Sequence, residues 1–259
     1  MGTVDKALSL LDFFSESRPE IGLSELARMA GYDKATVLRL MTALADRGFV
    51  EQNVKTRDFR LGPALLRLAH IREASLPQRA SAQPILERMS AESGETVHLL
   101  LLGKNHLETI DFIEASAHAM RVYMDAGERI PLHASASGLA CLAHMPVEEA
   151  RTALSGALRS YTDHTITDAS RILSHLDNVR KTGIAEIDQA FEDGVYGMAG
   201  PIFASDGSVT GAVGIATPSS RVTDAFRSKA HKIIRKAASD ITRAWGGVAP
   251  EAGNEETAA

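Results

Sequence analysis

The sequence contains a single cysteine, Cys141, among its 259 residues. One thiol excludes an internal disulfide framework and any all-cysteine metal site. Long apolar runs are also missing: the longest candidate, residues 99–102, is far shorter than the roughly 18 residues that a membrane-spanning helix needs. The first residues show no secretory pattern. We therefore expect a cytoplasmic protein with no membrane partner.

An excess of positive charge is missing as well, since the chain carries 28 basic and 33 acidic residues and a net charge of −5. This balance argues against a general nucleic-acid binder. The charge is unevenly distributed, however, because residues 34–67 contain 7 basic and only 3 acidic side chains. A local basic stretch on an otherwise acidic chain indicates one surface for an anionic polymer and a different role for the remainder.

The length of 259 residues predicts two domains, and a hydrophobic content of 44% is ordinary for a globular protein. In the first 62 residues, short helical patterns precede a hairpin. Val4, Leu8, Leu11 and Phe14 recur at helical spacing and predict one apolar face. Ser24 is placed to cap a second helix that Gly31 would end.

The third predicted helix, residues 34–47, has two contrasting sides. Asp33 can cap its start and Gly48 can end it. At 100° per residue, its buried side is aliphatic: Val37, Leu40, Met41 and Leu44. The opposite side is small and polar with one long cation: Ala35, Arg39, Thr42 and Ala43, with Thr36 on the flank. Such a helix can lie close against another surface.

Residues 48–51 and 57–61 are predicted to form two strands joined by a turn, with Lys55, Arg57 and Arg60 on or near them. A helix, a turn, a capped helix and a basic hairpin together are typical of a winged helix-turn-helix, which reads DNA by placing one helix in the major groove. A winged helix used for protein contact is the alternative. A linker helix is predicted from Pro63 to about residue 75.

From residue 76 onward, strands and helices alternate around hairpins, which predicts an α/β domain with a mainly antiparallel sheet. Strands are expected at residues 95–102, 107–113, 120–124, 184–188, 195–204 and 208–217. Helices are expected near residues 137–144, 147–158 and 169–182, and in a last amphipathic stretch to Trp245. Residues 248–259 are mostly Ala, Glu, Gly, Asn and Thr, and are predicted to be a disordered tail.

Nine histidines raise the question of a metal site, but none shows a metal-binding spacing with another ligand. We predict no metal, no cofactor and no catalytic residue, because no nucleophile–base pair can be identified. Cys141 lies in an apolar helical pattern and is predicted to be a buried small hydrophobe, with a reactive thiol as the alternative. His133 is a candidate ligand contact because it precedes a serine-rich helix start.

The motifs of the first domain resemble those of IclR-type transcriptional regulators, at residues 4–11, 23–27, 34–40, 47–50 and 59–63. The resemblance continues through residues 94–99, 131–138, 165–168 and 200–203, and therefore spans nearly the whole chain. It implies an α+β fold in which an N-terminal winged helix-turn-helix is joined by a linker helix to a GAF-like effector-binding domain. The expected boundaries are residues 1–62, 63–75 and 76–247, followed by the tail 248–259.

Contacts with double-stranded operator DNA are expected at the outer face of the third helix and at the hairpin. Arg39 can bond guanine in the major groove, and Lys34 can meet a phosphate at the helix start. The expected DNA-binding residues are Ser24, Lys34, Ala35, Thr36, Arg39, Thr42, Lys55, Arg57 and Arg60.

The effector is expected near the helix start at residues 132–138, where free backbone N–H groups favour an anion. The resemblance adds strand positions, so the expected effector-binding residues are His133, Ser135, Ala136, Ser137, Ile187, Gly197, Met198, Gly214 and Ala216. Relatives that bind small oxo-acids carry polar side chains at several of these places, and their common lysine is Leu139 here. Fewer polar donors suggest a roomier or more apolar ligand, or one that is held mainly by backbone groups.

We therefore predict a regulator, acting as a repressor rather than an activator, whose operator affinity a small organic metabolite controls. The resemblance implies a homodimer or a dimer of dimers, hence a homotetramer. Two alternatives stay open: a small-molecule enzyme with an accessory winged helix, and an interaction scaffold without an effector.

Overall fold

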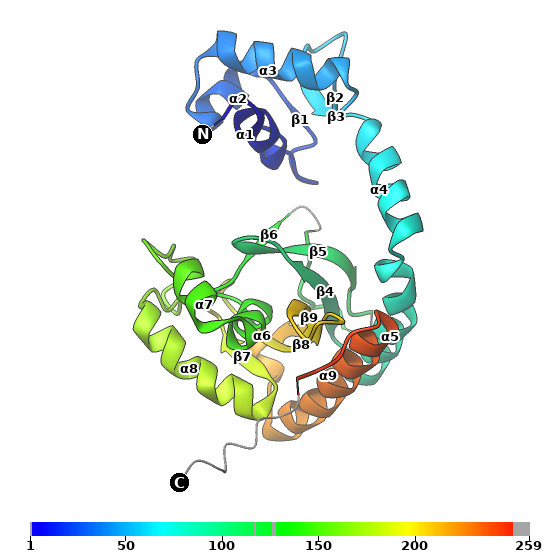
Figure 1. Ribbon diagram of the computed structural model, residues 1–259, viewed down its shortest axis with the longest axis vertical. Coiled ribbons are helices and arrows are strands. Elements are labelled where there is room, and N and C mark those ends of the chain that lie inside the picture. The colour runs from blue at the N-terminus through cyan, green and yellow to red at the C-terminus, as the bar shows by residue number, and fades with distance from the viewer. Residues whose placement is uncertain (1, 117, 126–127, 251–259) are drawn as a thin grey trace. The chain divides into compact units, whose positions relative to one another are not determined.

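The computed structural model describes residues 2–116, 118–125 and 128–250 (Figure 1). The chain divides into two compact units, Met1–Pro77 and Gln78–Ala259. Most of the tail for which disorder is predicted, residues 251–259, lies outside the described residues. Among the helices of the described part, none combines the length and the apolar character needed to cross a membrane.

The first unit combines short helices with a small sheet. Its elements are α1 (Thr3–Ser9), the 3-10 helix η1 (Leu11–Phe13), β1 (Glu20–Ile21), α2 (Leu23–Ala30), α3 (Lys34–Asp46), β2 (Val50–Gln52), β3 (Phe59–Leu61) and α4 (Ala64–Ser75). The strands pair antiparallel in the order β1-β3-β2. Two helices joined by a turn and followed by a hairpin therefore appear as the sequence predicts.

The core of the first unit confirms the predicted sides of the third helix. The aliphatic side of α3 is buried against α2 and the sheet, through Val37, Leu40, Met41 and Leu44. Asp33 caps α3, because its carboxylate accepts hydrogen bonds from the backbone N–H of Thr36 at 2.8 Å and from the Thr36 hydroxyl at 2.7 Å. These bonds stabilise the charged carboxylate and lower the pKa of Asp33.

Two local predictions in this unit are wrong. Val4 and Leu8 are 70% and 50% exposed, whereas Leu10 and Phe14 are buried. The reason is that α1 ends at Ser9 and a 3-10 helix follows, so the 3.6-residue period stops before the predicted face is complete. Ser24 does not cap α2, because α2 already begins at Leu23 and has Gly22 at its N-cap position.

The second unit places helices on both faces of one large sheet. Its elements are α5 (Gln78–Ser93), β4 (Thr96–Leu102), β5 (His106–Ile113), β6 (Arg129–Pro131), α6 (Ala136–His144), α7 (Val147–Ala153), α8 (Ala169–Thr182), β7 (Ala185–Asp188), β8 (Val195–Phe203), β9 (Val209–Pro218), η2 (Ser219–Arg221) and α9 (Asp224–Ala244). All neighbouring strands pair antiparallel, in the order β6-β5-β4-β9-β8-β7. The predicted mainly antiparallel α+β fold is confirmed.

The strand predicted at residues 120–124 is wrong, since these residues form no strand and the edge strand β6 lies at Arg129–Pro131. Side chains from other elements bind two of the backbone carbonyls of this segment. The Thr96 hydroxyl donates to the Val122 carbonyl at 2.8 Å, and the Arg221 guanidinium donates to the Met120 carbonyl at 2.5 Å. The helix predicted to reach residue 158 also stops earlier, at Ala153.

Alternation along the strands gives the sheet two apolar faces, each with its own helices (Figure 1). One face packs against α6 and α8, and the other packs against α5 and α9. On β8, for example, Ala199 points to the α6 side, whereas Met198 points to the α9 side. This alternation decides which strand residues can reach a site beside α6.

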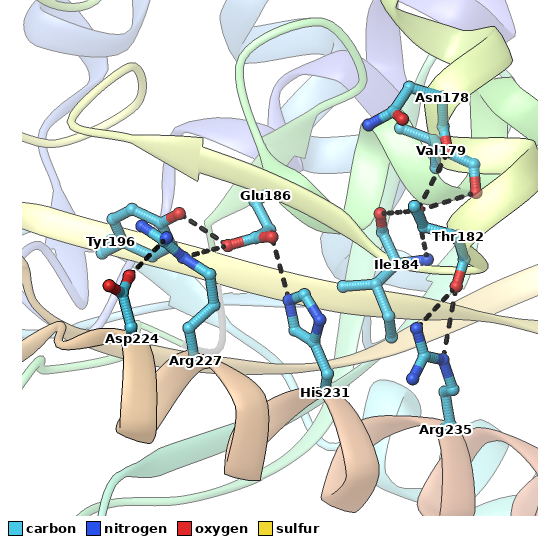
Figure 2. A network of polar contacts seen from close by, with 10 residues as sticks. All are labelled: Asn178, Val179, Thr182, Ile184, Glu186, Tyr196, Asp224, Arg227, His231 and Arg235. Atoms are coloured by element: carbon cyan, nitrogen blue, oxygen red, sulfur yellow. Dashed lines mark hydrogen bonds and ion pairs between the residues drawn. The ribbon is translucent and has the colours of Figure 1, made fainter.

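A polar network joins the start of α9 to the sheet edge (Figure 2). The Glu186 carboxylate accepts a hydrogen bond from the Tyr196 hydroxyl at 2.6 Å, contacts Nε2 of His231 at 2.9 Å, and pairs with Arg227 at 3.1 Å. Burial and the bond to Glu186 raise the pKa of Tyr196 to about 12. Further along α9, Arg235 donates to the Thr182 carbonyl at 3.0 Å, so α9 is also held against the end of α8.

We expect Ile234→Ala to lower the free energy of unfolding of the second unit by about 2–5 kcal/mol. Ile234 is fully buried in α9 and faces Gly200 on β8, so its loss leaves a cavity. Trp245, the only tryptophan of the chain, follows α9, and its fluorescence reports on this unit during urea unfolding. Lys232→Ala, on the exposed side of α9, is the control and should change little. Equal stabilities of the two variants would contradict the packing of Ile234 against β8.

Candidate functional sites

The outer face of α3 is the candidate nucleic-acid interface. Ala35, Arg39, Thr42 and Ala43 are exposed on it, and Lys34 is exposed at its start. Within the described part of the chain, neither Lys34 nor Arg39 has a carboxylate within ion-pair distance. Their positive charges are therefore available to an anionic polymer, which is the condition that contact with phosphates or guanine requires.

The two threonines of this face have hydroxyl groups that already donate hydrogen bonds. The Thr42 hydroxyl donates to the Leu38 carbonyl at 2.8 Å, and the Thr36 hydroxyl donates to Asp33. A threonine bonded to its own helix in this way has no free O–H donor for an outside group. The surface of α3 is therefore less polar than its composition suggests.

The hairpin formed by β2 and β3 carries the remaining predicted cations. Asn53 shapes its turn by accepting a hydrogen bond from the Lys55 backbone at 2.9 Å, and Arg57 has a positive φ of 66°. Lys55 and Arg57 are exposed. Arg60 differs from them, because its guanidinium lies 2.6 Å from the Glu51 carboxylate and 3.6 Å from that of Glu20. These two carboxylates already compensate its charge.

A groove brings residues of α2, α3 and the hairpin together. Ser24 and Arg57, which the sequence assigns to the same interface, both line it. Leu38 and Gln52 line it as well, although the sequence did not point to either. Leu38 was missed because aliphatic residues at helical spacing suggest a core position, whereas its side chain is 46% exposed.

The second unit contains a cavity of about 80 Å³ beside the start of α6. Six of the nine predicted effector-binding residues line it: Ser135, Ala136, Ser137, Ile187, Gly197 and Ala216. The remaining lining is mostly apolar and includes residues that the sequence did not indicate: His98, Leu100, Val122, Tyr123, Met124, Glu128, Ile130, Phe191, Glu192 and Val195. Strands β4, β8 and β9, helix α6 and the segment before β6 thus enclose one space.

The N-terminus of α6 is held at this cavity by Ser135. Its hydroxyl donates to the Pro131 carbonyl at 2.7 Å and accepts from the Gly138 backbone at 3.0 Å. Gly138 is required here, because a Cβ at that position would lie 2.2 Å from the Leu132 carbonyl oxygen. The cap leaves the first N–H groups of the helix, at Ala136 and Ser137, pointing toward the helix N-terminal end, where they favour an anion or a carbonyl oxygen.

His98 and Ser137 form the most buried polar pair of the cavity. Nε2 of His98 lies 2.9 Å from the Ser137 hydroxyl, while Nδ1 of the same ring is buried without a hydrogen-bond partner in the described structure. Burial lowers the pKa of His98 to about 4, so the imidazole is neutral at neutral pH. Gly214 lies opposite His98 in the ladder, and a Cβ there would come within 2.5 Å of Nε2.

Two glutamates supply the negative charge of the cavity. Partial burial raises the pKa of Glu192, and burial together with the charges of Asp125 and Glu192 raises the pKa of Glu128. No lysine or arginine is among the described residues that line the space. A ligand carboxylate would therefore meet backbone N–H groups at α6 rather than a cationic side chain.

The other three predicted effector residues lie elsewhere or act indirectly. His133 faces a neighbouring hollow, where Nε2 lies 2.9 Å from the Arg159 carbonyl. Met198 points to the opposite face of the sheet, and Gly214 makes room for His98 without lining the cavity. Cys141 is fully buried, and burial raises the pKa of its thiol, as a packed and unreactive cysteine requires.

In the part of the chain that the structure describes, no three His, Cys, Asp or Glu residues gather closely enough to hold a metal ion.

Comparison with known proteins gives two family matches. The model described as "IclR helix-turn-helix domain" matches residues 3–54, and "Bacterial transcriptional regulator IclR C-terminal" matches residues 73–243. The chain is 30% identical to the transcriptional repressor IclR of Escherichia coli (strain K12) over 249 residues, covering 95% of this chain and 90% of that protein.

Two solved structures extend the comparison. A crystal structure described as an ICLR transcriptional regulator from Silicibacter sp. TM1040 has 41% identity and a TM-score of 0.89, and covers 97% of this chain and 99% of that one. An IclR homolog from Microbacterium hydrocarbonoxydans, solved in complex with 4-hydroxybenzoate, has 25% identity and a TM-score of 0.77, and covers 94% of this chain and 99% of that one.

We expect the stability of the second unit to depend on pH through His98. Because the folded state lowers the pKa of His98 from 6.5 to about 4, the unfolded chain takes up the proton first as the pH falls. The contribution of neutral His98 to the free energy of unfolding is complete above pH 6.5. It falls by up to about 3 kcal/mol as the pH is lowered from 6.5 to 4. Urea unfolding of the wild type and of His98→Gln, followed by Trp245 fluorescence, measures this difference. A difference that is constant over that pH range would contradict the assignment.

Proposed function

The chain belongs to the IclR family of bacterial transcriptional regulators, and from this premise we propose that it is a repressor whose operator affinity is set by a small organic effector. It is a DNA-binding regulator with an effector-binding C-terminal domain, and not an enzyme. The repressor role is supported by the name of the Escherichia coli relative, "Transcriptional repressor IclR". We assign DNA binding to residues 1–62, the linker to residues 63–75, effector binding to residues 76–247, and a tail to residues 248–259.

The observation that carries the proposal is the outer face of α3. An aliphatic side anchors this helix in the core, and the opposite side presents small residues around the uncompensated cation of Arg39. A helix of this shape fits the major groove of B-DNA, where Arg39 can bond guanine O6 and N7. Lys34, Lys55 and Arg57 supply positive charge for the neighbouring phosphates. Arg60 contributes less, because Glu51 and Glu20 compensate its charge.

We place the effector in the cavity beside α6. Its lining supports a ligand whose body is apolar and whose polar end meets the N–H groups of Ala136 and Ser137. The relative from Microbacterium hydrocarbonoxydans was solved with 4-hydroxybenzoate, a ligand with an apolar ring and a carboxylate end. The enclosed volume of about 80 Å³ favours a small organic molecule or a cavity that widens on binding.

We propose that the protein acts as a homodimer or a dimer of dimers on a palindromic or near-palindromic operator in the cytoplasm. Two symmetric copies of a helix-turn-helix read two half-sites of opposite orientation. Large apolar side chains of α4, such as Leu66 and Ile71, are 76% and 53% exposed and offer a surface for another copy. The ligand changes operator affinity because it binds the DNA-competent and DNA-incompetent arrangements unequally.

The experiment that tests the proposal measures the fluorescence anisotropy of labelled DNA from the region directly upstream of the coding sequence. The full-length protein is titrated at two salt concentrations against this duplex and against a scrambled one. Selective binding supports the proposal, whereas equal affinity for every duplex of a tiled upstream set would refute it. Small organic acids, starting with 4-hydroxybenzoate, are then added to the complex to find a change in anisotropy.

We expect Arg39→Ala to weaken specific operator binding by about 1–3 kcal/mol, as the loss of a bidentate guanine contact does. Binding to the scrambled duplex should weaken much less, because phosphates carry that affinity. Arg151→Ala removes the same charge from the exposed surface of α7 in the second unit and serves as the control. If Arg39→Ala bound the operator as tightly as this control, Arg39 would have no recognition role.

We expect Gly197→Val to abolish the effector response without lowering operator affinity in the absence of a ligand. The new side chain would start 3.3 Å from Cβ of Ala136 and fill the cavity. Met198→Leu changes the next residue, which faces the other side of the sheet, at nearly constant volume. Thermal shift and operator anisotropy with the compound found in the screen compare the two variants. An unaltered response in Gly197→Val would place the effector outside this cavity.

A further inference from the structure

Leu38 is an unusual residue to find on the surface that faces DNA. Within the described residues of α3, it is the only large apolar side chain that is exposed, at 46%. Covering a leucine that is exposed to this degree lowers the free energy of a complex, because apolar surface is removed from water. Its position on the reading helix raises the question of which group covers it.

The neighbours of Leu38 on α3 define the partner. Lys34 precedes it by four residues and Thr42 follows it by four, so the three side chains form one ridge along the exposed side of the helix. Ala35 and Arg39 lie beside this ridge. Val37 and Met41, which also neighbour Leu38 on the helix, belong to the buried side. Leu38 therefore lies at the border between the core and the face that is placed to contact phosphates and base edges.

The polarity of this ridge is lower than its sequence suggests. The Thr42 hydroxyl donates to the Leu38 carbonyl at 2.8 Å, so Thr42 has no free O–H donor. Around Arg39, the face thus offers methyl and methylene groups from Ala35, Leu38 and Thr42. Apart from the Arg39 guanidinium, these side chains would contact a base edge through apolar groups.

The major groove presents one apolar group to such a face, the C5-methyl of thymine. The other base-edge groups in the groove are hydrogen-bond donors and acceptors, which a leucine would leave unsatisfied. We infer that Leu38 is a specificity-determining residue that packs on a thymine methyl in the same half-site as the guanine read by Arg39. This inference rests on the proposed function and adds which base the helix selects beside that guanine.

The other possible use of Leu38 is a protein contact. Leu38 borders the groove between α2 and the hairpin, which Ser24 and Arg57 also line. A second copy or another protein seated there would bury the same side chain. Glu20, Glu25 and Asp58 line the groove as well, whereas the charged residues beside Leu38 on the exposed side of α3, Lys34 and Arg39, are cations and favour the polyanion. The two occupants predict opposite results below.

The experiment begins with in vitro selection of binding sites by the full-length protein from a random duplex library. In the selected duplex, each thymine is then replaced in turn by deoxyuridine, which removes only the methyl group and keeps base pairing. Anisotropy gives the affinity for each duplex. We expect the wild type to lose about fourfold at one thymine of each half-site, the amount that corresponds to one buried methyl group.

Two variants of Leu38 and one matched control complete the test. Leu38→Ala and Leu38→Gln should bind the thymine and uracil duplexes equally well, and both substitutions are compatible with an exposed helix position. Val54→Ala shortens another exposed apolar side chain of the same unit, in the hairpin turn, and should keep the full sensitivity to uracil.

The outcomes separate the inference from the proposed function. If selection enriches no sequence, the proposed function fails, and the inference fails with it. If a motif is found but no thymine responds to uracil, or if Leu38→Ala responds like the wild type, only the role of Leu38 is overturned. A shift in the oligomeric state of free Leu38→Ala, combined with unchanged uracil sensitivity, would assign Leu38 to a protein contact instead.

Discussion

The second unit depends on how closely α6 can approach the sheet. Both surfaces that meet there are made of small residues: Ala136 and Gly138 on the helix, and Gly197 and Ala199 on β8. A Cβ on Gly197 would lie 3.3 Å from that of Ala136, so the backbone of β8 approaches the start of the helix about as closely as small residues allow. Because the approach is close, the helix start and the strands enclose the cavity between them. The cavity that we propose for the effector is thus a consequence of backbone packing.

The two units use charge in opposite ways. In the first unit, local bonds neutralise some polar groups, such as Arg60 with its two carboxylates, and leave Arg39 free for an outside partner. In the cavity of the second unit, His98 is kept neutral by burial, and two of the lining acids, Glu128 and Glu192, have raised pKa values. The free cations of the first unit suit a polyanion, whereas under the proposed function the second unit would select a small molecule by shape and by backbone donors.

Helices and strands could be predicted from the sequence where the hydrophobic spacing and the capping residues indicate the same element. For α3, aliphatic spacing, the Asp33 cap and Gly48 all indicate the same helix, and the structure has it. The segment 120–124 was mistaken for a strand because Val122 and its neighbours have β propensity, while the groups that bind its backbone, Thr96 and Arg221, are remote in sequence. His98, Glu128 and Glu192 were missed as cavity residues for the same reason: only the folded sheet brings them to α6.

The covalent route by which a ligand can influence the first unit passes through the junction of α4 and α5. The helix α4 ends at Ser75, and α5 begins at Gln78, directly after Pro77. On the side of the second unit this start is fixed, because the Trp245 indole donates to the Gln78 carbonyl at 3.1 Å and to the Ser81 hydroxyl at 3.2 Å. The helix α9 that precedes Trp245 packs on β8, the strand that supplies Gly197 to the cavity. A ligand that displaces β8 therefore acts on a helix that holds the junction, and the sign of regulation depends on which arrangement of that junction the ligand binds more tightly.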